Sequence, residues 1–435
     1  MTLGIPLEST RLANGLRVVA SPDRSAPVVT LGVYYRIGFR LEPPGRSGFA
    51  HLFEHMMFQG SEHAGKMMHI RLVNSSGGVL NGSTSYDYTN YYEAVPSNAL
   101  ERVLWLEADR MASLKVNEEN LRNQRDVVKE EVRVNVLNKP YGGFPWLDLP
   151  PVAYRRWPNA HNFYGDFEDL DAASVEDVCE FFRTYYTPRN AVLVVVGDVE
   201  PDEVARLAER YFGPIPAGPE PPPEDVAEAP PGEERRGVVE EKFGNLRGLA
   251  IGYFLPEKWT ADWYACGLAD RVLHAGRAGR LYRELVLDRE AAIEVGGGVH
   301  YPGGDLFDYR GPMLMTTRIL HRPATSVSAT LEAFDRVIDD FRERGPEPNE
   351  LEQVKAKLRS DYFSALDGDG ATPRSGRMHY LACFTLFDDD PARLNTATDP
   401  FLELAPGDLR EAARRYLMPA NRAIVERRPV NGGAA

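Results

Sequence analysis

The sequence is poor in cysteine, and it has no long apolar run and no cluster of basic residues. Only 3 of its 435 residues are cysteine. That odd number, at widely separated positions, fits neither a disulfide framework nor a Cys-x-x-Cys metal knuckle. Nowhere do about 20 apolar residues follow one another, as a membrane-spanning helix would need. The net charge of −14 argues against nucleic acid as a partner, because binding phosphates requires a basic face.

The N-terminal stretch also lacks a basic segment followed by an apolar one, which is the pattern of a secretory signal. We therefore expect a cytoplasmic protein that has neither nucleic acid nor membrane as a partner. The composition, 43% hydrophobic and 26% charged, is typical of a folded globular chain. Its length favours two or more domains.

Proline is abundant in one segment near the middle of the chain. Residues 213–237 are dense in proline, glycine and acidic residues, a composition that cannot pack a core and tends to be extended. We predict a linker over residues 216–237 between an N-terminal domain, 1–215, and a C-terminal domain, 238–435. Both halves show strand and helix patterns in similar amounts, so we expect a duplicated α+β domain.

The periodicity of apolar residues places the main elements of both halves. In the first half it predicts strands over residues 15–22, 28–38 and 191–199, a strand pair over 77–95, and helices over 47–58, 98–114, 118–138 and 201–212. In the second half it predicts a strand over 248–256 and helices over 262–276 and 348–366.

The stretch HLFEH places two of the nine histidines, His51 and His55, four residues apart in a predicted helix. Residues four apart lie on one helix face, so both imidazoles can reach one ion. A catalytic zinc site keeps three protein ligands and leaves one position open. Glu54 lies on nearly the same side and would serve as the general base that takes a proton from water. The alternative, a pair of core histidines, predicts no third ligand.

A third ligand can be sought on the helix predicted over residues 118–138, where Glu130 and Glu131 are neighbours. At 100° per residue, Glu131 falls at the margin of the apolar stripe that contains Leu121 and Val128, whereas Glu130 falls toward the solvent side. The helical wheel therefore favours Glu131, and Glu130 stays as the alternative.

With these residues the sequence resembles the M16 family of zinc peptidases, which includes pitrilysin, insulysin and the mitochondrial processing peptidase. HxxEH is the inverzincin signature, and LANGLRVV, GFAHLFEHMMFQGS, GGVLNGSTSYDYTNYY and YTPRNAVLVVVGDV follow in family order. The family's third ligand lies about 76 residues after the second histidine, which is Glu131 here. The resemblance, closest to the M16B branch, implies one Zn²⁺ held by His51, His55 and Glu131, with Glu54 as the base. It also implies two LuxS/MPP-like domains, each a mostly antiparallel sheet packed against helices.

The resemblance further implies how a peptide substrate is held. The strand that begins at GGVLNGST would be a sheet edge to which an extended peptide adds itself as a strand. Asn81 and Gly82 match the family's substrate-backbone positions, although Gly82 could instead mark a bulge or turn. Gln124 stands where the family usually has a second glutamate, and its amide can still hydrogen-bond a metal ligand or water. The four tyrosines of this segment are interpreted as packing residues.

M16 enzymes also use an arginine and a tyrosine, seven residues apart, from the C-terminal half of the assembly. Val286 and Ile293 occupy the matching positions here, and neither side chain can donate a hydrogen bond to an oxyanion. We therefore expect the chain to be the zinc-bearing subunit of a heterodimer whose zinc-free M16 partner supplies the Arg/Tyr pair. A shifted alignment would offer Arg283 or Arg289 with Tyr282, at spacings that do not fit.

Three functions are compatible with these features. The first is a zinc-dependent endopeptidase subunit that cleaves extended peptides, and the complete set of His51, Glu54, His55 and Glu131 favours it. The alternative is a non-catalytic structural or interaction subunit of an M16-fold complex, which would usually have lost HxxEH. A third, zinc-dependent hydrolysis or lyase chemistry on a small molecule, is disfavoured by the predicted edge strand.

Overall fold

The computed structural model describes residues 3–223, 225–322, 324–368 and 372–430, and the chain forms two compact units. The first unit comprises Met1–Glu130, Phe163–Asp225 and Tyr362–Ala397. The second comprises Glu131–Asn162, Val226–Asp361 and Thr398–Ala435. Among the described residues, no helix combines the length and the apolarity needed to cross a membrane.

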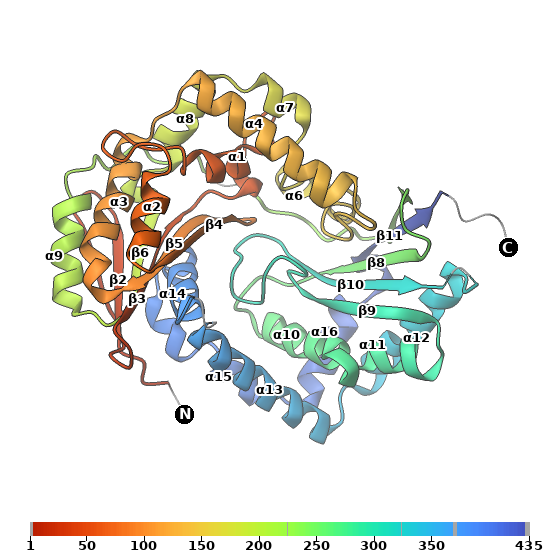
Figure 1. Ribbon diagram of the computed structural model, residues 1–435. Helices are drawn as coiled ribbons and strands as arrows, with labels where there is room; N and C mark the ends of the chain where they lie inside the picture. The colour runs from red at the N-terminus through yellow and green to blue at the C-terminus, as the bar shows by residue number, and fades with distance from the viewer. Residues whose placement is uncertain (1–2, 224, 323, 369–371, 431–435) are drawn as a thin grey trace. The chain divides into compact units, whose positions relative to one another are not determined.

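The first unit is built on a six-stranded sheet (Figure 1). Its strands lie in the order β1 (Glu8–Arg11), β2 (Arg17–Pro22), β6 (Ala191–Gly197), β3 (Val28–Tyr35), β5 (Thr89–Pro96) and β4 (Val79–Thr84). The β2–β6 pair is parallel and every other pair is antiparallel. Strand β6 is buried along its whole length, which accounts for its continuous run of valine and leucine.

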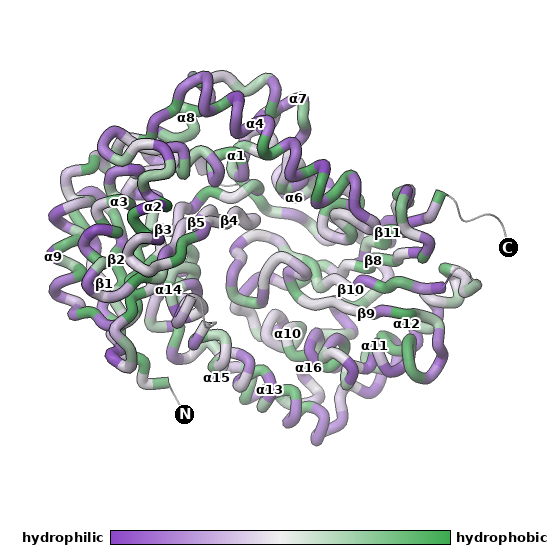
Figure 2. Tube along the Cα trace, in the orientation of Figure 1, coloured by the Kyte–Doolittle hydropathy of each residue, from purple (hydrophilic) through white to green (hydrophobic). Residues whose placement is uncertain are grey.

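Helices cover one face of this sheet. They are α1 (Phe49–Met56), α2 (Met68–Ser75), α3 (Leu100–Ser113), α4 (Glu118–Val132), α7 (Phe167–Ala172), α8 (Val175–Tyr185) and α9 (Pro201–Phe212). Apolar side chains of α1, α3, α8 and α9 form one core with the strands. In Figure 2 these helices alternate between purple and green along their length, as expected for helices with one apolar face.

The opposite face of the first sheet is covered by α14 (Ser375–Asp388), which packs on β3 and β6. Gly32 of β3 permits this approach, because a Cβ atom there would lie 2.6 Å from the sulfur of Met378. The side chain of Thr30, also in β3, donates to the carbonyl of Pro373 just before the helix, at 2.5 Å. A helix from the second half of the sequence thus completes the first unit.

The second unit is built on a five-stranded sheet with the order β7 (Arg235–Glu241), β11 (Arg422–Pro429), β8 (Arg247–Phe254), β10 (Leu314–His321) and β9 (Ala292–Val299). The β7–β11 pair is parallel and the others are antiparallel. Without β1, both sheets arrange their strands as first, fifth, second, fourth and third in chain order. This shared topology confirms the predicted α+β class with two similar domains.

The remaining α-helices belong to the second unit, except that α13 begins there and ends in the first. They are α5 (Pro150–Ala153), α6 (Trp157–Ala160), α10 (Ala261–His274), α11 (Arg280–Tyr282), α12 (Val327–Arg344), α13 (Pro348–Asp367), α15 (Asp399–Glu403) and α16 (Pro406–Tyr416). The segment that contains α5 packs Phe144, Leu149 and Tyr154 against the second sheet. Gly252 of β8 admits Leu149, whose Cδ2 would lie 2.8 Å from a Cβ atom there.

The units therefore differ from two contiguous domains at residues 1–215 and 238–435. Residues 131–162 belong to the second unit and residues 362–397 to the first, because each segment supplies the cover for one face of the other half's sheet. The predicted linker over 216–237 also overlaps the first strand of the second sheet. Its last three residues already pair with β11 as the start of β7.

Candidate metal centre

Helix α1, which carries HLFEH, begins at a glycine rather than at a residue that can cap it. Gly48 occupies the N-cap position with φ 81° and has no side chain to accept from the first turn. The buried carboxylate of Glu42 takes that role, because it accepts from the N–H groups of Gly48 at 2.8 Å and Ala50 at 2.6 Å. A carboxylate at this end of a helix satisfies otherwise unpaired N–H groups and complements the helix dipole.

The apolar side of α1 fixes the direction in which the histidines point. Phe49, Leu52, Phe53 and Met56 are buried in the core of the first unit. The rings of His51 and His55 lie on the other side of the helix, with centroids 4.9 Å apart and planes at 90°. The ring of His51 also contacts Phe163 and Tyr164, at centroid distances of 4.4 and 5.2 Å. Aromatic packing therefore restrains one of the two imidazoles.

Glu131 completes a group of three potential ligands. One ligand atom each of His51, His55 and Glu131 lies within 4.8 Å of the other two. Glu131 is near the end of α4, which is one continuous helix from Glu118 to Val132 and contributes Leu121 and Val128 to the core of the first unit. Two imidazoles and one carboxylate form the His₂Glu set of catalytic zinc sites.

A second group in the first unit has the same donor types. His69 of α2, Glu93 of β5 and Glu107 of α3 are all buried, with ligand atoms within 4.8 Å of one another. Here, however, Arg110 forms a hydrogen-bonded ion pair with Glu107 and lies 3.8 Å from Glu93. The Arg110 guanidinium already pairs with one of these carboxylates, so a metal ion at the same place would lie beside a buried cation. Only the first group fits a metal ion among the residues described.

The proposed base, Glu54, is half-buried on α1. Its Oε2 accepts a hydrogen bond from the hydroxyl of Thr84 at 2.9 Å. Thr84 is the last residue of β4, which forms an edge of the first sheet. Asn81 is exposed on this strand and Gly82 is buried. A Cβ atom on Gly82 would lie 3.1 Å from the ring of Tyr91, so close packing favours glycine there.

The burial of neighbouring residues on α4 agrees with the helical wheel. Glu130 is exposed and Glu131 is half-buried. Gln124, seven residues before Glu131, is buried on the same helix. The predicted helix over 118–138 continues past α4 as a π-helix, η3 (Arg133–Leu137).

Val286 and Ile293 lie in the second unit, where neither provides a polar group. Val286 is half-buried in the π-helix η6 (Arg283–Asp288). Ile293 is 44% exposed in β9. Of the shifted candidates, Arg289 pairs with Glu284 and Arg283 is exposed.

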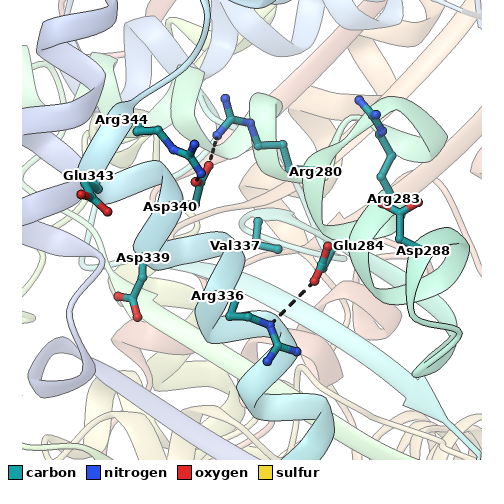
Figure 3. A pocket seen from close by; sticks show the side chains of 10 residues that line it. All are labelled: Arg280, Arg283, Glu284, Asp288, Arg336, Val337, Asp339, Asp340, Glu343 and Arg344. Atoms are coloured by element: carbon teal, nitrogen blue, oxygen red, sulfur yellow. Dashed lines mark hydrogen bonds and ion pairs between the residues drawn. The ribbon is translucent and has the colours of Figure 1, made fainter.

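A pocket of about 580 Å³ lies beside this segment, between η6 and α12 (Figure 3). Its charged side chains form ion pairs with one another, Arg280 with Asp340 at 3.3 Å and Arg336 with Glu284 at 3.8 Å. It contains no histidine or cysteine. Arginines pair with two of its carboxylates, so the pocket does not offer a ligand set like that of His51, His55 and Glu131.

Two residues that shape the site, Glu42 and Thr84, are not apparent from the sequence alone. The absence of a capping side chain at Gly48 is the only local signal for Glu42, and it does not say which carboxylate takes its place. Thr84 is one of two threonines in the strand pair, and its contact with Glu54 depends on the packing of α1 against β4.

Two domain models of one peptidase family match the sequence. "Insulinase (Peptidase family M16)" matches residues 17–140, which include HxxEH and Glu131. "Peptidase M16 inactive domain" matches residues 172–358. The chain belongs to the M16 family.

One relative of this M16 chain matches it over nearly the whole length of both sequences. The "Zinc protease PqqE" of Helicobacter pylori is 28% identical over 97% of this chain and 93% of its own. A probable mitochondrial-processing peptidase subunit beta of Arabidopsis thaliana is 28% identical over 51% of this chain and 41% of its own. Among solved structures, a protease from Helicobacter pylori superposes with a TM-score of 0.88 at 26% identity, over 98% of this chain and 100% of its own.

Proposed function

We propose that the chain is the zinc-bearing subunit of an endopeptidase that hydrolyses extended peptides. The observation that carries this proposal is the convergence of His51, His55 and Glu131 within 4.8 Å of one another. The same arrangement is the donor set of zinc hydrolases that keep an open position for water or substrate. A full-length relative named as a zinc protease supports the assignment.

His51, His55 and Glu131 would hold the ion, which supplies Lewis acidity toward a carbonyl and acidifies water when it is bound. Glu54, next to His55 on α1, would accept a proton from the attacking water and return it to the leaving amine. Gln124 would support the ligand set by hydrogen bonding from two turns before Glu131 on α4. Helix α1 would thus supply two metal ligands and the base, and α4 would supply the third ligand and its support.

The substrate would bind as an additional strand on β4. The strand is an edge of its sheet, so its outer backbone groups can pair with an extended peptide regardless of the peptide's sequence. Asn81 and Gly82 would contact the peptide backbone, since both lie on this strand. Such pairing favours unfolded or extended segments over folded proteins.

A second M16 subunit would complete the active enzyme. Val286 and Ile293 cannot stabilise an oxyanion, and loss of one such donor costs roughly a hundredfold to a thousandfold in rate. The related mitochondrial-processing peptidase is itself named as a subunit. We propose that a zinc-free M16 partner brings the missing Arg/Tyr pair to this chain.

The test is metal analysis combined with cleavage of an unstructured fluorogenic peptide, for the chain alone and with the M16 partner copurified from its host. We expect one zinc per chain, weak cleavage alone and faster cleavage with the partner. Glu54→Gln should keep its zinc and lose at least about a hundredfold in kcat. Glu131→Gln should lose zinc, whereas its exposed neighbour serves as the matched control, with Glu130→Gln retaining both zinc and turnover.

Two results would contradict the proposal. Turnover that survives in Glu54→Gln would remove that residue as the base. A chain without zinc or cleavage in either arm would instead favour a non-catalytic subunit of an M16-fold complex.

A further inference from the structure

Thr84 of the edge strand reaches the proposed base with its side-chain hydroxyl. Its Oγ1 lies 2.9 Å from Glu54 Oε2 and 3.4 Å from the carbonyl oxygen of Ala50. A hydroxyl group has a single proton to donate. The shorter contact, to a carboxylate oxygen, is the stronger of the two hydrogen bonds.

The backbone around Thr84 holds this hydroxyl in place. Thr84 pairs with Thr89 at the closed end of the β4–β5 ladder, and the hydroxyl of Thr89 donates to the carbonyl of Ile37 at 2.7 Å. In the turn that follows, the N–H of Ser85 donates to the carbonyl of Tyr88 at 2.8 Å. The hydroxyl of Thr84 is therefore presented by a hydrogen-bonded hairpin rather than by a mobile loop.

A glutamate side chain has three rotatable bonds, so a general base needs a partner that keeps one oxygen directed at the water it deprotonates. The hydrogen bond from Thr84 restrains the carboxylate through one of its two oxygens, Oε2. We propose that Thr84 is the positioning residue for Glu54. This inference rests on the proposed function, in which Glu54 is the base.

The arrangement also couples substrate binding to the base. Thr84 belongs to the strand on which the peptide would pair, two residues beyond Gly82. A peptide seated on β4 and the carboxylate that serves it thus share one rigid support. Loss of the hydroxyl should lower the rate of the chemical step without weakening the pairing of the peptide backbone with β4.

The test compares Thr84→Val, which is nearly isosteric, with Thr84→Ser, which keeps the hydroxyl. Thr84→Val should keep its zinc and its KM, while kcat falls about tenfold to a hundredfold, the range seen when outer supports of a metal site are removed. Thr84→Ser should restore most of the lost kcat. The matched control is Thr30→Val, which removes a hydrogen-bonded threonine hydroxyl elsewhere in the same sheet and should leave kcat unchanged.

Crystal structures of the metal-free wild type and of Thr84→Val provide a readout that does not depend on turnover. We expect a single conformer of the Glu54 side chain in the wild type and more than one in the variant. An unchanged kcat, a change confined to KM or zinc content, no rescue by serine, or an unchanged Glu54 conformer would each overturn the inference. If Glu54→Gln itself retains turnover, the proposed function fails, and the Glu54 conformers still decide whether Thr84 positions this side chain.

Discussion

Two groups of ionisable residues have the same donor types, histidine and glutamate, and differ in what balances their negative charge. In the group of His51, His55 and Glu131, a divalent cation would be the positive charge beside the carboxylate. In the group around Glu93 and Glu107, Arg110 occupies that place. Counting histidines and glutamates in a sequence cannot separate these cases, because the arginine belongs to the same helix as Glu107 and its direction depends on packing.

The buried pair of carboxylates should make stability depend on pH. Burial raises the pKa of Glu107 from 4.5 to about 8, against the opposing effect of Arg110, and burial also raises the pKa of Glu93. One guanidinium balances one carboxylate, so the pair retains a proton near neutral pH. A carboxyl group with a raised pKa binds its proton more tightly in the folded state. Its contribution to stability is therefore complete below about pH 4.5 and is lost as the pH rises to about 8.

Glu93→Gln should weaken this pH dependence. The variant removes the surplus carboxylate and leaves the Arg110–Glu107 ion pair intact, so Glu107 no longer needs a proton. From pH 6 to pH 8, the free energy of unfolding should fall less in the variant than in the wild type, by roughly 1 to 3 kcal/mol. Urea unfolding at several pH values measures the difference.

Glu101, an exposed residue of the helix α3 that also carries Glu107, gives the control for that measurement. It pairs with Arg210 at the surface, so Glu101→Gln should follow the wild-type pH dependence. Parallel loss of stability with pH in Glu93→Gln and the wild type would show that the buried pair does not hold the proton.

At the scale of single elements, the helix that carries HLFEH could be predicted, but its start could not be explained. The apolar spacing predicts a helix over 47–58, and α1 spans Phe49–Met56. Its N-terminus depends on Glu42, which lies six residues before Gly48 in the sequence. Likewise, the wheel that favoured Glu131 over Glu130 agrees with their burial, because α4 is regular up to Val132. The irregular π-helical continuation leaves no such pattern in the sequence.

Glu42→Ala should destabilise α1 and weaken metal binding together. Two charge-assisted hydrogen bonds to the first turn are lost, at a cost of about 1 to 3 kcal/mol. Because both histidines lie on this two-turn helix, fraying of its start should raise the zinc dissociation constant about tenfold or more. Competition with a chromogenic chelator measures that constant.

The control is a variant that removes the N-terminal cap of a different helix, α8. Ser174 and Asp177 form a capping box there, and Ser174→Ala should cost about 1 kcal/mol without changing zinc affinity. Zinc affinity that is equal in Glu42→Ala and the wild type would show that the carboxylate only stabilises the fold.

At the scale of the whole molecule, the duplication could be predicted and the exchange of segments could not. Strand and helix patterns recur in both halves, and the two sheets share one topology. Which helix covers which sheet depends on contacts between residues more than 300 positions apart, such as Gly32 with Met378. A proline-rich segment indicates where the chain changes units once, but it carries no information about the other crossings, two of which fall within α4 and α13.

Because of this exchange, fragments cut at the proline-rich segment should not fold independently. Residues 1–215 lack α14, whose buried residues include Met378, Leu381 and Phe384. Each large apolar side chain contributes about 1.5 to 3 kcal/mol, so the loss is comparable with the total stability of a domain, about 5 to 15 kcal/mol. Residues 238–435 likewise lack Phe144, Leu149 and Tyr154 over the second sheet.

We expect each fragment to be insoluble or molten when it is expressed alone, and the two to copurify as a folded complex when they are coexpressed. The control is the intact chain nicked at a protease site inserted at residues 218–222. It keeps both covering segments in place and should retain its circular dichroism and cooperative unfolding. If either fragment alone is monomeric and unfolds cooperatively, the covering segments are dispensable and the two halves fold as contiguous domains.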